Sequence, residues 1–258
     1  MTKWFCRRSD VLMTWLPVLL IASGTMIGCS MKAPIDDGAG TVEAGSDSAV
    51  TASAHGAGTA PAEARPEAAP SHLLFNGESL DGWEKADFGG QGDVHVEEGV
   101  LVLPQGDPLT GVRWTGPFPT MDYEIELEAQ REAGTDFFCG LTFPVGDTCA
   151  SLILGGWAGE TCGISSFEDM DASENETMFY RSFETNRWYA VKLRVTTTKV
   201  EAWLDGEQVV DIDTEGRRIG TRPEIDLCRP LGFASYLTAA ALRDIRWRPV
   251  ETETMQED

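Results

Sequence analysis

The sequence has little positive charge and very little histidine. Only 20 residues are Lys or Arg, against 42 Asp and Glu, so that the formal net charge of the 258-residue chain is −22. Binding of a nucleic-acid backbone depends on basic patches, and this balance argues against a nucleic-acid partner. Of the three histidines, His55 lies in a low-complexity stretch. A zinc site of three histidines in the folded part is therefore excluded by counting.

A long apolar segment is also missing from the N-terminus. The apolar run at residues 11–27 is shorter than the roughly 20 residues that a membrane-spanning helix needs. With basic residues before it and small residues after it, the run has the pattern of an export signal. Met26-Ile27-Gly28-Cys29 resembles the lipobox of bacterial lipoproteins, which implies that residues 1–28 are a signal peptide and that Cys29 becomes a lipidated N-terminus. An ordinary secretory signal with an incidental cysteine is the alternative.

Residues 29–71 are rich in Ala, Gly, Pro, Ser and Thr and contain no aromatic residue. Such a composition buries too little apolar surface to offset the entropy of ordering, so we expect a disordered spacer. The acidic tail at 251–258 is expected to fray for the same reason. The lipid on Cys29 would anchor the exported protein to a membrane, facing the periplasm or the cell exterior, and it would be the only membrane contact.

Residues 72–250 have the pattern of an all-β domain. The chain contains 27 glycines and 13 prolines, and no window of this region keeps a helical period. Residues 123–129 alternate strictly between apolar side chains and glutamates, and residues 188–195 alternate in the same way. Asp205-Gly206, between two short apolar segments, is a strong hairpin signal. Further short strands are expected at 94–96, 100–103, 137–145, 150–154, 178–183 and 231–236. The pattern predicts a two-sheet antiparallel sandwich or jelly roll.

Four cysteines lie within this domain, at positions 139, 149, 162 and 228. An exported protein can form disulfides, and four cysteines allow three pairings, among which the sequence does not choose. Free buried thiols are the alternative. No Cys-x-x-Cys motif is present, so neither zinc binding nor thiol exchange is expected.

The start of the domain resembles a known family. Residues 74–83 read Leu-Phe-Asn-Gly-Glu-Ser-Leu-Asp-Gly-Trp and resemble the opening signature of the 3-keto-disaccharide hydrolase family. Further matches follow in the family's order at 123–130, 188–189, 203–206 and 242–246. The resemblance implies a concanavalin-A-like lectin/glucanase fold. Asp205 and Asp244 stand where the family usually has Asn.

The resemblance implies cleavage of glycosides whose sugar carries a ketone at C3. The ketone acidifies the C2 proton, so that a base can remove this proton and the C1 substituent can leave by elimination, after which water can add. Glu128 aligns with a recurrent family glutamate on the polar face of its strand and is the candidate base, with a solvated carboxylate as the alternative. His95 is the second candidate for an acid or base, with a hydrogen-bonded structural histidine as the alternative.

Glu124, Glu126 and Glu128 also support a rival interpretation. They resemble the Glu-x-Asp-x-Glu strand of laminarinase-type glucanases, which share the fold. Retaining glycosidases hold two carboxyl groups about 5–5.5 Å apart, and Glu124 with Glu128 would form this pair. In an enzyme acting on 3-keto-sugars, Glu124 and Glu126 would instead be substrate-binding residues beside Glu128.

Other candidate residues lie in loops. Trp157, in a glycine-rich turn, is expected to be exposed and to stack on a sugar ring. Arg181 is a candidate ligand for a substrate oxygen, with ion pairing as the alternative. Asp169 and Asp171 have the alternate spacing of a calcium loop, although the usual glycine and closing glutamate are absent. The sequence thus leaves open Ca²⁺ or another divalent metal at this segment, or a solvated loop, and indicates no other cofactor.

Three classes of function are consistent with these residues. The family resemblance favours a hydrolase or lyase that acts on 3-keto-glycosides. A non-catalytic carbohydrate-binding, lectin-like module is the first alternative. A surface scaffold for protein interactions is the second.

Overall fold

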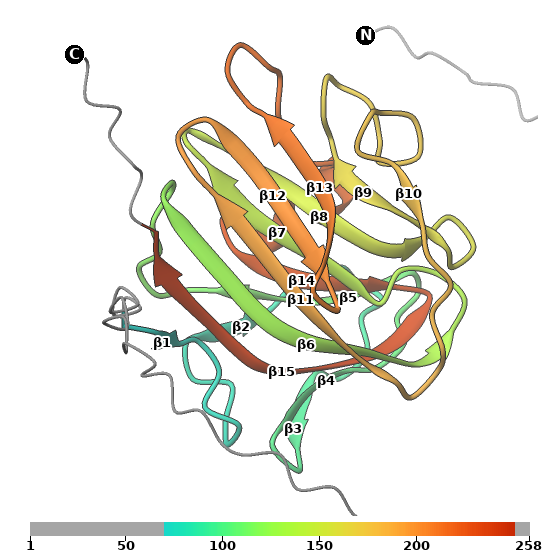
Figure 1. The fold of residues 1–258 in the computed structure, drawn as a ribbon. Coiled ribbons are helices and arrows are strands. Elements are labelled where there is room, and N and C mark those ends of the chain that lie inside the picture. The colour runs from blue at the N-terminus through green and yellow to red at the C-terminus, as the bar shows by residue number, and fades with distance from the viewer. Residues whose placement is uncertain (1–69, 251–258) are drawn as a thin grey trace, which may run out of the picture. The chain divides into compact units, whose positions relative to one another are not determined.

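The structure, a computed structural model, describes residues 70–250, which form two antiparallel sheets. The order of the eight-stranded sheet is β13-β12-β11-β6-β15-β4-β3, with β1 also paired to β15, and that of the seven-stranded sheet is β10-β9-β8-β7-β14-β5-β2. Figure 1 shows β12, β11, β6 and β15 side by side in one layer, with β7, β8 and β14 in the layer behind. The expected all-β, two-sheet antiparallel sandwich is therefore confirmed.

The strand bounds are as follows. The eight-stranded sheet contains β1 (His72–Leu73), β3 (His95–Glu97), β4 (Val100–Leu103), β6 (Tyr123–Gly134), β11 (Trp188–Val195), β12 (Lys199–Leu204), β13 (Glu207–Asp213) and β15 (Thr238–Pro249). The seven-stranded sheet contains β2 (Trp83–Lys85), β5 (Leu109–Trp114), β7 (Cys139–Val145), β8 (Thr148–Gly156), β9 (Thr161–Ser165), β10 (Phe179–Tyr180) and β14 (Gly232–Tyr236). A 3₁₀ helix, η1 (Pro223–Cys228), precedes β14.

The core lies between the two sheets. Tyr123, Ile125 and Leu127 of β6 are buried and face Leu141 and Phe143 of β7 across the sandwich, because alternate residues of a strand point to the same side. Burial of each such side chain contributes roughly 1.5–3 kcal/mol. The Tyr123 hydroxyl also donates a hydrogen bond to the Pro144 carbonyl oxygen, 2.6 Å away. The glutamates between these apolar residues consequently point away from the core.

The hairpin expected at Asp205-Gly206 joins β12 to β13. Both turn residues have positive φ, 51° for Asp205 and 83° for Gly206, which fits the right-handed twist of a two-residue hairpin. Asp tolerates this left-handed conformation nearly as well as Asn does, so the departure from the family pattern at Asp205 costs the turn little.

The predicted strand at 178–183 is much shorter than expected. Only Phe179 and Tyr180 pair with β9, and the next backbone bond runs from Arg181 N to the Glu160 carbonyl of the preceding turn. The chain then leaves the sheet.

Part of the outer face of the seven-stranded sheet is made of small residues and is covered by other segments. A Cβ at Gly232 would lie 3.0 Å from Cβ of Cys228, and one at Gly163 would lie 3.2 Å from Cβ of Ala172. Only glycine therefore permits η1 to rest on β14 and the loop at 166–178 to rest on β9. We call this surface, which includes Gly140, Thr142, Ser151, Gly163, Gly232 and Ala234, the small-residue floor.

Cys139, Cys149, Cys162 and Cys228 are all buried free thiols. Of the two alternatives that the sequence leaves open, free thiols are therefore the one found. Within residues 70–250 no helix is long and apolar enough to cross a bilayer. The predicted signal peptide, Cys29, residues 29–69 of the predicted spacer and the tail at 251–258 lie outside the described residues.

Candidate functional site

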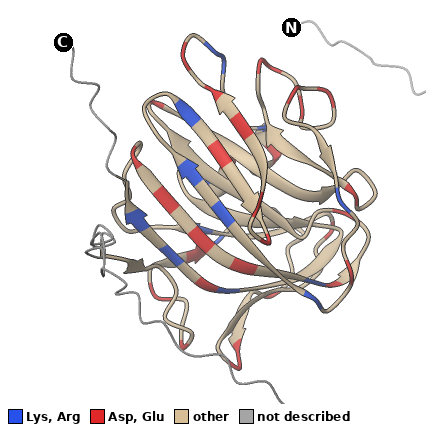
Figure 2. Ribbon diagram, in the orientation of Figure 1, with Lys and Arg blue, Asp and Glu red and all other residues tan. Residues whose placement is uncertain are grey.

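Figure 2 shows acidic residues along β6 and basic residues on the neighbouring strands β11 and β15 of the eight-stranded sheet. The acidic stripe on β6 consists of Glu124, Glu126 and Glu128. Arginines of β15 line one side of it and basic residues of β11 line the other. Opposite charges on directly paired residues stabilise a sheet, so the alternation that predicted strand β6 also provides its cross-strand ion pairs.

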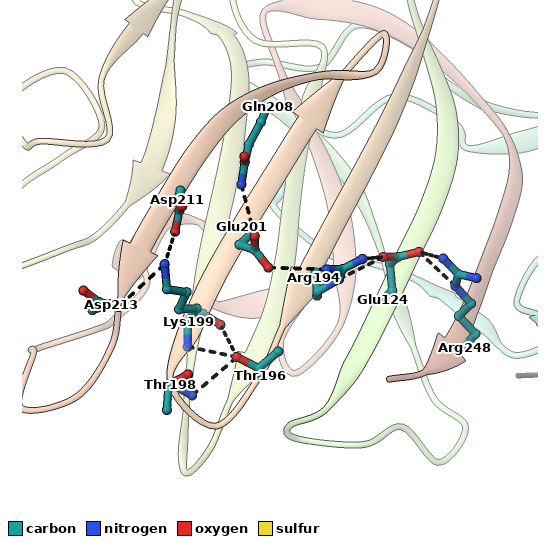
Figure 3. Close-up of polar contacts among 10 residues, drawn as sticks. All are labelled: Glu124, Arg194, Thr196, Thr198, Lys199, Glu201, Gln208, Asp211, Asp213 and Arg248. Atoms are coloured by element: carbon teal, nitrogen blue, oxygen red, sulfur yellow. Dashed lines mark hydrogen bonds and ion pairs between the residues drawn. The ribbon is translucent and has the colours of Figure 1, made fainter. Parts of the chain in front are cut away.

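Glu124 is the centre of this array (Figure 3). Its side chain has no exposed surface and accepts hydrogen bonds from Nε and Nη2 of both Arg194 and Arg248, with the Arg194 bonds at 3.1 and 2.9 Å. Burial alone would raise the pKa of Glu124, but the hydrogen bonds from Arg248 and Arg194 outweigh burial and lower the pKa below its ordinary value. A carboxylate without exposed surface cannot reach a sugar, so neither substrate binding by Glu124 nor its laminarinase-like pairing with Glu128 fits the structure.

Glu126 and Glu128 are more accessible but also ion-paired. Glu126 Oε2 accepts a bond from Arg246 Nε at 2.9 Å, and Glu128 Oε2 accepts one from Arg243 Nε at 2.6 Å. The Arg243 guanidinium in turn stacks on Trp188, 4.1 Å from the ring centroid. Both carboxylates border a shallow groove of about 410 Å³ that also includes Lys192, Trp203 and Arg246. Glu128 therefore lies at the edge of a polar groove, held by an arginine.

His95 does not reach this groove. The register places it in one row with Val102, Ala241 and Gln130, so it shares the outer face with Glu128 but lies three strands from β6. Three strand spacings amount to about 14 Å. Its Nδ1 lies 2.9 Å from the Asp93 carbonyl, which matches the structural alternative for this histidine.

A second cavity, of about 400 Å³, lies on the outer face of the seven-stranded sheet. We call it the Trp157 pocket. Its apolar wall comes mainly from Phe137, Ile153, Trp157, Ile225 and Tyr236, and its polar groups from Asp136, Ser165, Arg222 and Glu224. It therefore combines aromatic surfaces with two carboxylates and a guanidinium, as sugar-binding pockets require.

Trp157 extends from the turn between β8 and β9, with φ of 48° and 39% exposure. The expected exposure of Trp157 is thus found. Asp136 fixes this turn, because its Oδ2 accepts a hydrogen bond from Ala158 N at 3.3 Å while its Oδ1 accepts one from Phe137 N at 2.8 Å. The Asp136 carboxylate is therefore committed to shaping the pocket wall.

Arg222, at the start of η1, joins two carboxylates. Its guanidinium donates to Asp171 and to Glu224, the latter through Nη2 at 2.9 Å and Nε at 3.3 Å. The hydrogen bond from Arg222 is the main reason that the pKa of Glu224 lies below its ordinary value of 4.5. The bond to Glu224 likewise raises the pKa of Arg222. Glu224, with 55% of its side chain exposed, is thus an ionised carboxylate that borders the pocket.

The acidic loop that suggested calcium is organised by Asn175. Its Nδ2 donates to the carbonyls of Ile164, Met170 and Asp171, and its Oδ1 accepts from Thr177. The two candidate metal ligands each bind an arginine, Asp169 with Arg218 at 2.7 Å and Asp171 with Arg222. Within residues 70–250 no three His, Cys, Asp or Glu side chains are grouped as a metal site would need.

Arg181 also lies away from the pocket lining. Its Nη1 donates to Glu207 Oε2 at 3.0 Å, which links the β10 side of one sheet to β13 of the other. Of the two alternatives for Arg181, ion pairing is the one observed.

The sequence thus indicated Trp157 as a sugar-stacking residue, but it did not show which other residues line the same pocket. The pocket joins Asp136, Arg222, Glu224 and Tyr236 from three separate segments. The one local signal is Arg222-Pro223-Glu224, where a proline opens a short helix and an acidic residue occupies its first turn.

Comparison with known proteins identifies one family and several distantly similar structures. The family model described as "3-keto-alpha-glucoside-1,2-lyase-like domain" matches residues 70–248. A comparison with curated protein sequences gave no match.

Three solved structures illustrate the likenesses. A Bacillus subtilis protein of unknown function with a galectin-like fold is 12% identical, with 70% of this chain and 94% of that chain covered and a TM-score of 0.49. A carbohydrate-binding module from Bacillus subtilis is 12% identical, with 65% and 95% covered and a TM-score of 0.42. The Crh5 transglycosylase in complex with NAG is 12% identical, with 70% and 84% covered and a TM-score of 0.48. At these values the likenesses carry no argument about function.

Proposed function

Because the chain belongs to the family of 3-keto-alpha-glucoside-1,2-lyase-like domains, we propose that it cleaves the glycosidic bond of 3-keto-sugars in the Trp157 pocket. The reaction begins with loss of the C2 proton to a carboxylate, which leaves an enolate across C2 and C3. The enolate electrons then form a C1–C2 double bond as the C1–oxygen bond breaks, and the departing oxygen takes a proton from water. The hydroxide left behind removes the proton from the carboxylic acid, which regenerates the base. Addition of water to the unsaturated product completes a net hydrolysis.

The observation that supports this proposal is that Trp157, Arg222 and Glu224 line the same cavity. A sugar ring can stack on the exposed indole of Trp157. The Glu224 carboxylate is the proposed base, because it is ionised at neutral pH and is exposed where it borders the cavity. The Arg222 guanidinium is the proposed partner of the enolate oxygen, because it is a fixed cation placed beside that base.

Glu128 remains the second candidate base for the same reaction. It borders the groove with Trp203 and Lys192 on the opposite sheet, and it is the residue that the family resemblance suggests. An arginine holds each of the two carboxylates, but Glu128 is only 33% exposed, against 55% for Glu224. Glu224 is more accessible and lies next to a sugar-stacking aromatic residue, which favours the Trp157 pocket.

The test compares Glu224→Gln with Glu128→Gln on 4-nitrophenyl 3-keto-α-glucoside, whose cleavage releases coloured nitrophenolate. Loss of a positioned base typically lowers kcat by about 10²–10⁴-fold, and the isosteric amide leaves binding contacts in place. We expect this loss for Glu224→Gln and a change of less than threefold for Glu128→Gln. The reverse pattern would move the site to the eight-stranded sheet. Loss in both variants alike, with folding intact, would reject the assignment of a single base.

The pH dependence gives an independent check on Glu224. A base with a lowered pKa stays active as the pH falls, and activity is lost only as the pH passes through that lowered value. The acidic limb of kcat/KM should therefore lie below pH 4.5. A limb between pH 6 and 7 would indicate a histidine instead.

A non-catalytic carbohydrate-binding function is the second candidate. The observation that favours it is the neutralisation of Arg222 by Asp171 and Glu224, which reduces the positive charge available to an enolate. In that case the wild-type protein would bind the 3-keto-glucoside without releasing nitrophenolate, and Trp157→Ala would abolish the binding.

We further propose that the protein is exported and held at a membrane by a lipid on Cys29. The support is the Met26-Ile27-Gly28-Cys29 motif after a short apolar run. A soluble 3-keto-glycoside, the substrate proposed above, would reach a domain tethered in this way.

A further inference from the structure

Arg131, on the inner face of β6, is a buried cation without a carboxylate partner. The residue is 7% exposed, and among residues 70–250 no Asp or Glu lies within salt-bridge distance of it. Its Nε has no hydrogen-bond partner in this part of the chain. Burial lowers the pKa of the Arg131 guanidinium from its ordinary value, although an arginine keeps its charge. A buried, incompletely bonded cation is costly and needs an explanation.

The hydrogen bonds of the Arg131 guanidinium go to the Trp157 turn and to Asp136. Its Nη2 donates to the carbonyl oxygens of Gly155 at 3.3 Å, Gly159 at 3.0 Å and Asp136 at 3.3 Å. Gly155 and Gly159 lie on either side of Trp157, so the guanidinium ties together the two ends of the turn that carries the indole. Arg131 thus reaches from one sheet, through the sandwich interior, to the pocket wall on the other.

The glycines of this turn leave the space that the guanidinium occupies. A Cβ at Gly155 would lie 2.4 Å from Nη2 of Arg131, and a Cβ at Gly159 would lie 3.4 Å from Nη1. Both glycines also have positive φ, 76° and 107°. The turn therefore has its conformation only with small residues at its ends and the guanidinium between them.

Aromatic rings close the remaining sides of the cation. The guanidinium carbon lies 5.3 Å from the ring centroid of Phe138 and 5.8 Å from that of Phe183. These contacts stabilise the charge in place of a carboxylate. They also fix the side chain laterally, so that its donors stay directed at the turn.

We propose that Arg131 is a positioning residue for the sugar site. It holds Trp157 in place through the Gly155 and Gly159 carbonyls, and it holds Asp136 in place through the Asp136 carbonyl. The inference rests on the proposed function only for its kinetic consequence. A role in stability alone does not account for these contacts, because replacement of a buried charge by an apolar side chain of similar volume is often neutral or stabilising. The three carbonyl oxygens that accept hydrogen bonds from the guanidinium account for a charged side chain at this buried position.

The test uses the full chain with Arg131→Met, which keeps volume but removes all donors, and Arg131→Lys, which keeps charge but replaces the planar fork by a single ammonium. Arg187→Met is the matched control, since Arg187 stacks on the neighbouring Tyr189 at 4.5 Å but bonds Asp205 instead of the turn. Amide hydrogen exchange over residues 154–160 is measured for each variant, together with kcat and KM for 4-nitrophenyl 3-keto-α-glucoside.

We expect exchange in this segment to accelerate at least tenfold in Arg131→Met and to change little in Arg187→Met. The KM should rise about tenfold in Arg131→Met with kcat within threefold of wild type, and Arg131→Lys should recover part of both effects. A double variant with Trp157→Ala should add no further rise in KM, because both changes remove the same platform.

Unchanged exchange over 154–160 in a folded Arg131→Met protein would overturn the proposal. If that variant does not fold, Arg131→Lys decides in the same way. If the wild type shows no turnover, the proposed function fails, while the exchange measurement still tests the positioning of the turn.

Discussion

Replacement of Glu124 by Gln is expected to destabilise the domain far more than the same change two residues along the strand. Glu124 is fully buried between Arg194 and Arg248, whose side chains are 31% and 35% exposed. Removal of one member of a buried ion pair typically costs 3–5 kcal/mol, and hydrogen bonds to charged groups are worth about 1.5–3 kcal/mol each. Because both arginines can regain water, we expect a loss near the lower limit, about 3 kcal/mol.

The measurement is urea unfolding followed by tryptophan fluorescence, with thermal unfolding alongside. In a domain of this size 1 kcal/mol corresponds to roughly 2–4 °C, so the melting temperature should fall by roughly 6–12 °C. Glu126→Gln is the control, because Glu126 is 34% exposed and its partner Arg246 is 47% exposed. Exposed pairs of this kind contribute about 0.2–1 kcal/mol.

The pH dependence of the difference has a definite sign. The pKa of Glu124 is lowered in the folded protein, so its contribution is complete above the ordinary value of 4.5 and is lost as the pH falls through the folded-state value. The stability gap between wild type and Glu124→Gln should therefore close on acidification. A gap below 1 kcal/mol at neutral pH, or one that widens in acid, would refute this account of the charged stripes.

Two further predictions concern the cysteines. Cys29→Ser should move the protein from the membrane fraction to the soluble exported fraction, as fractionation and immunoblotting would show; unchanged membrane association would remove the lipoprotein interpretation. The buried thiols of Cys139, Cys162 and Cys228, whose pKa values are raised to about 12 mainly by burial, should react with a thiol reagent at pH 8 only after denaturant is added. Rapid stoichiometric labelling of the native protein would show that the sandwich opens readily.

Strand patterns could be predicted because they are local. The alternation of 123–129 and the Asp205-Gly206 turn depend on neighbours in sequence, and both appear in the structure, although β6 continues to Gly134. The short β10 could not be foreseen, since its length depends on how far the segment pairs with β9, which the local pattern of 178–183 does not specify.

The burial and ion pairing of the glutamates could not be predicted either, because they depend on residues that are distant in the sequence. The alternation correctly places Glu124 outside the core, but its burial comes from arginines that are 70 and 124 residues away in the sequence. The Trp157 pocket likewise joins Asp136 to Tyr236 and to η1. A single sequence carries no local signal for contacts between distant segments. Trp157 was therefore recognisable as a candidate site residue by its glycine-rich turn, whereas Glu224 was not.

The small-residue floor has a consequence for how this sandwich can diversify. The segments at 166–178 and 214–231 rest on glycines and carry Asp171, Arg222 and Glu224, while the core between the sheets takes only a few residues from these segments, such as Phe167 and Leu231. The stability of the scaffold and the chemistry of the pocket are thus encoded in largely separate parts of the chain. New ligand preferences can arise by exchange of these two covering segments alone, provided that each replacement still presents its backbone to Gly163 and Gly232.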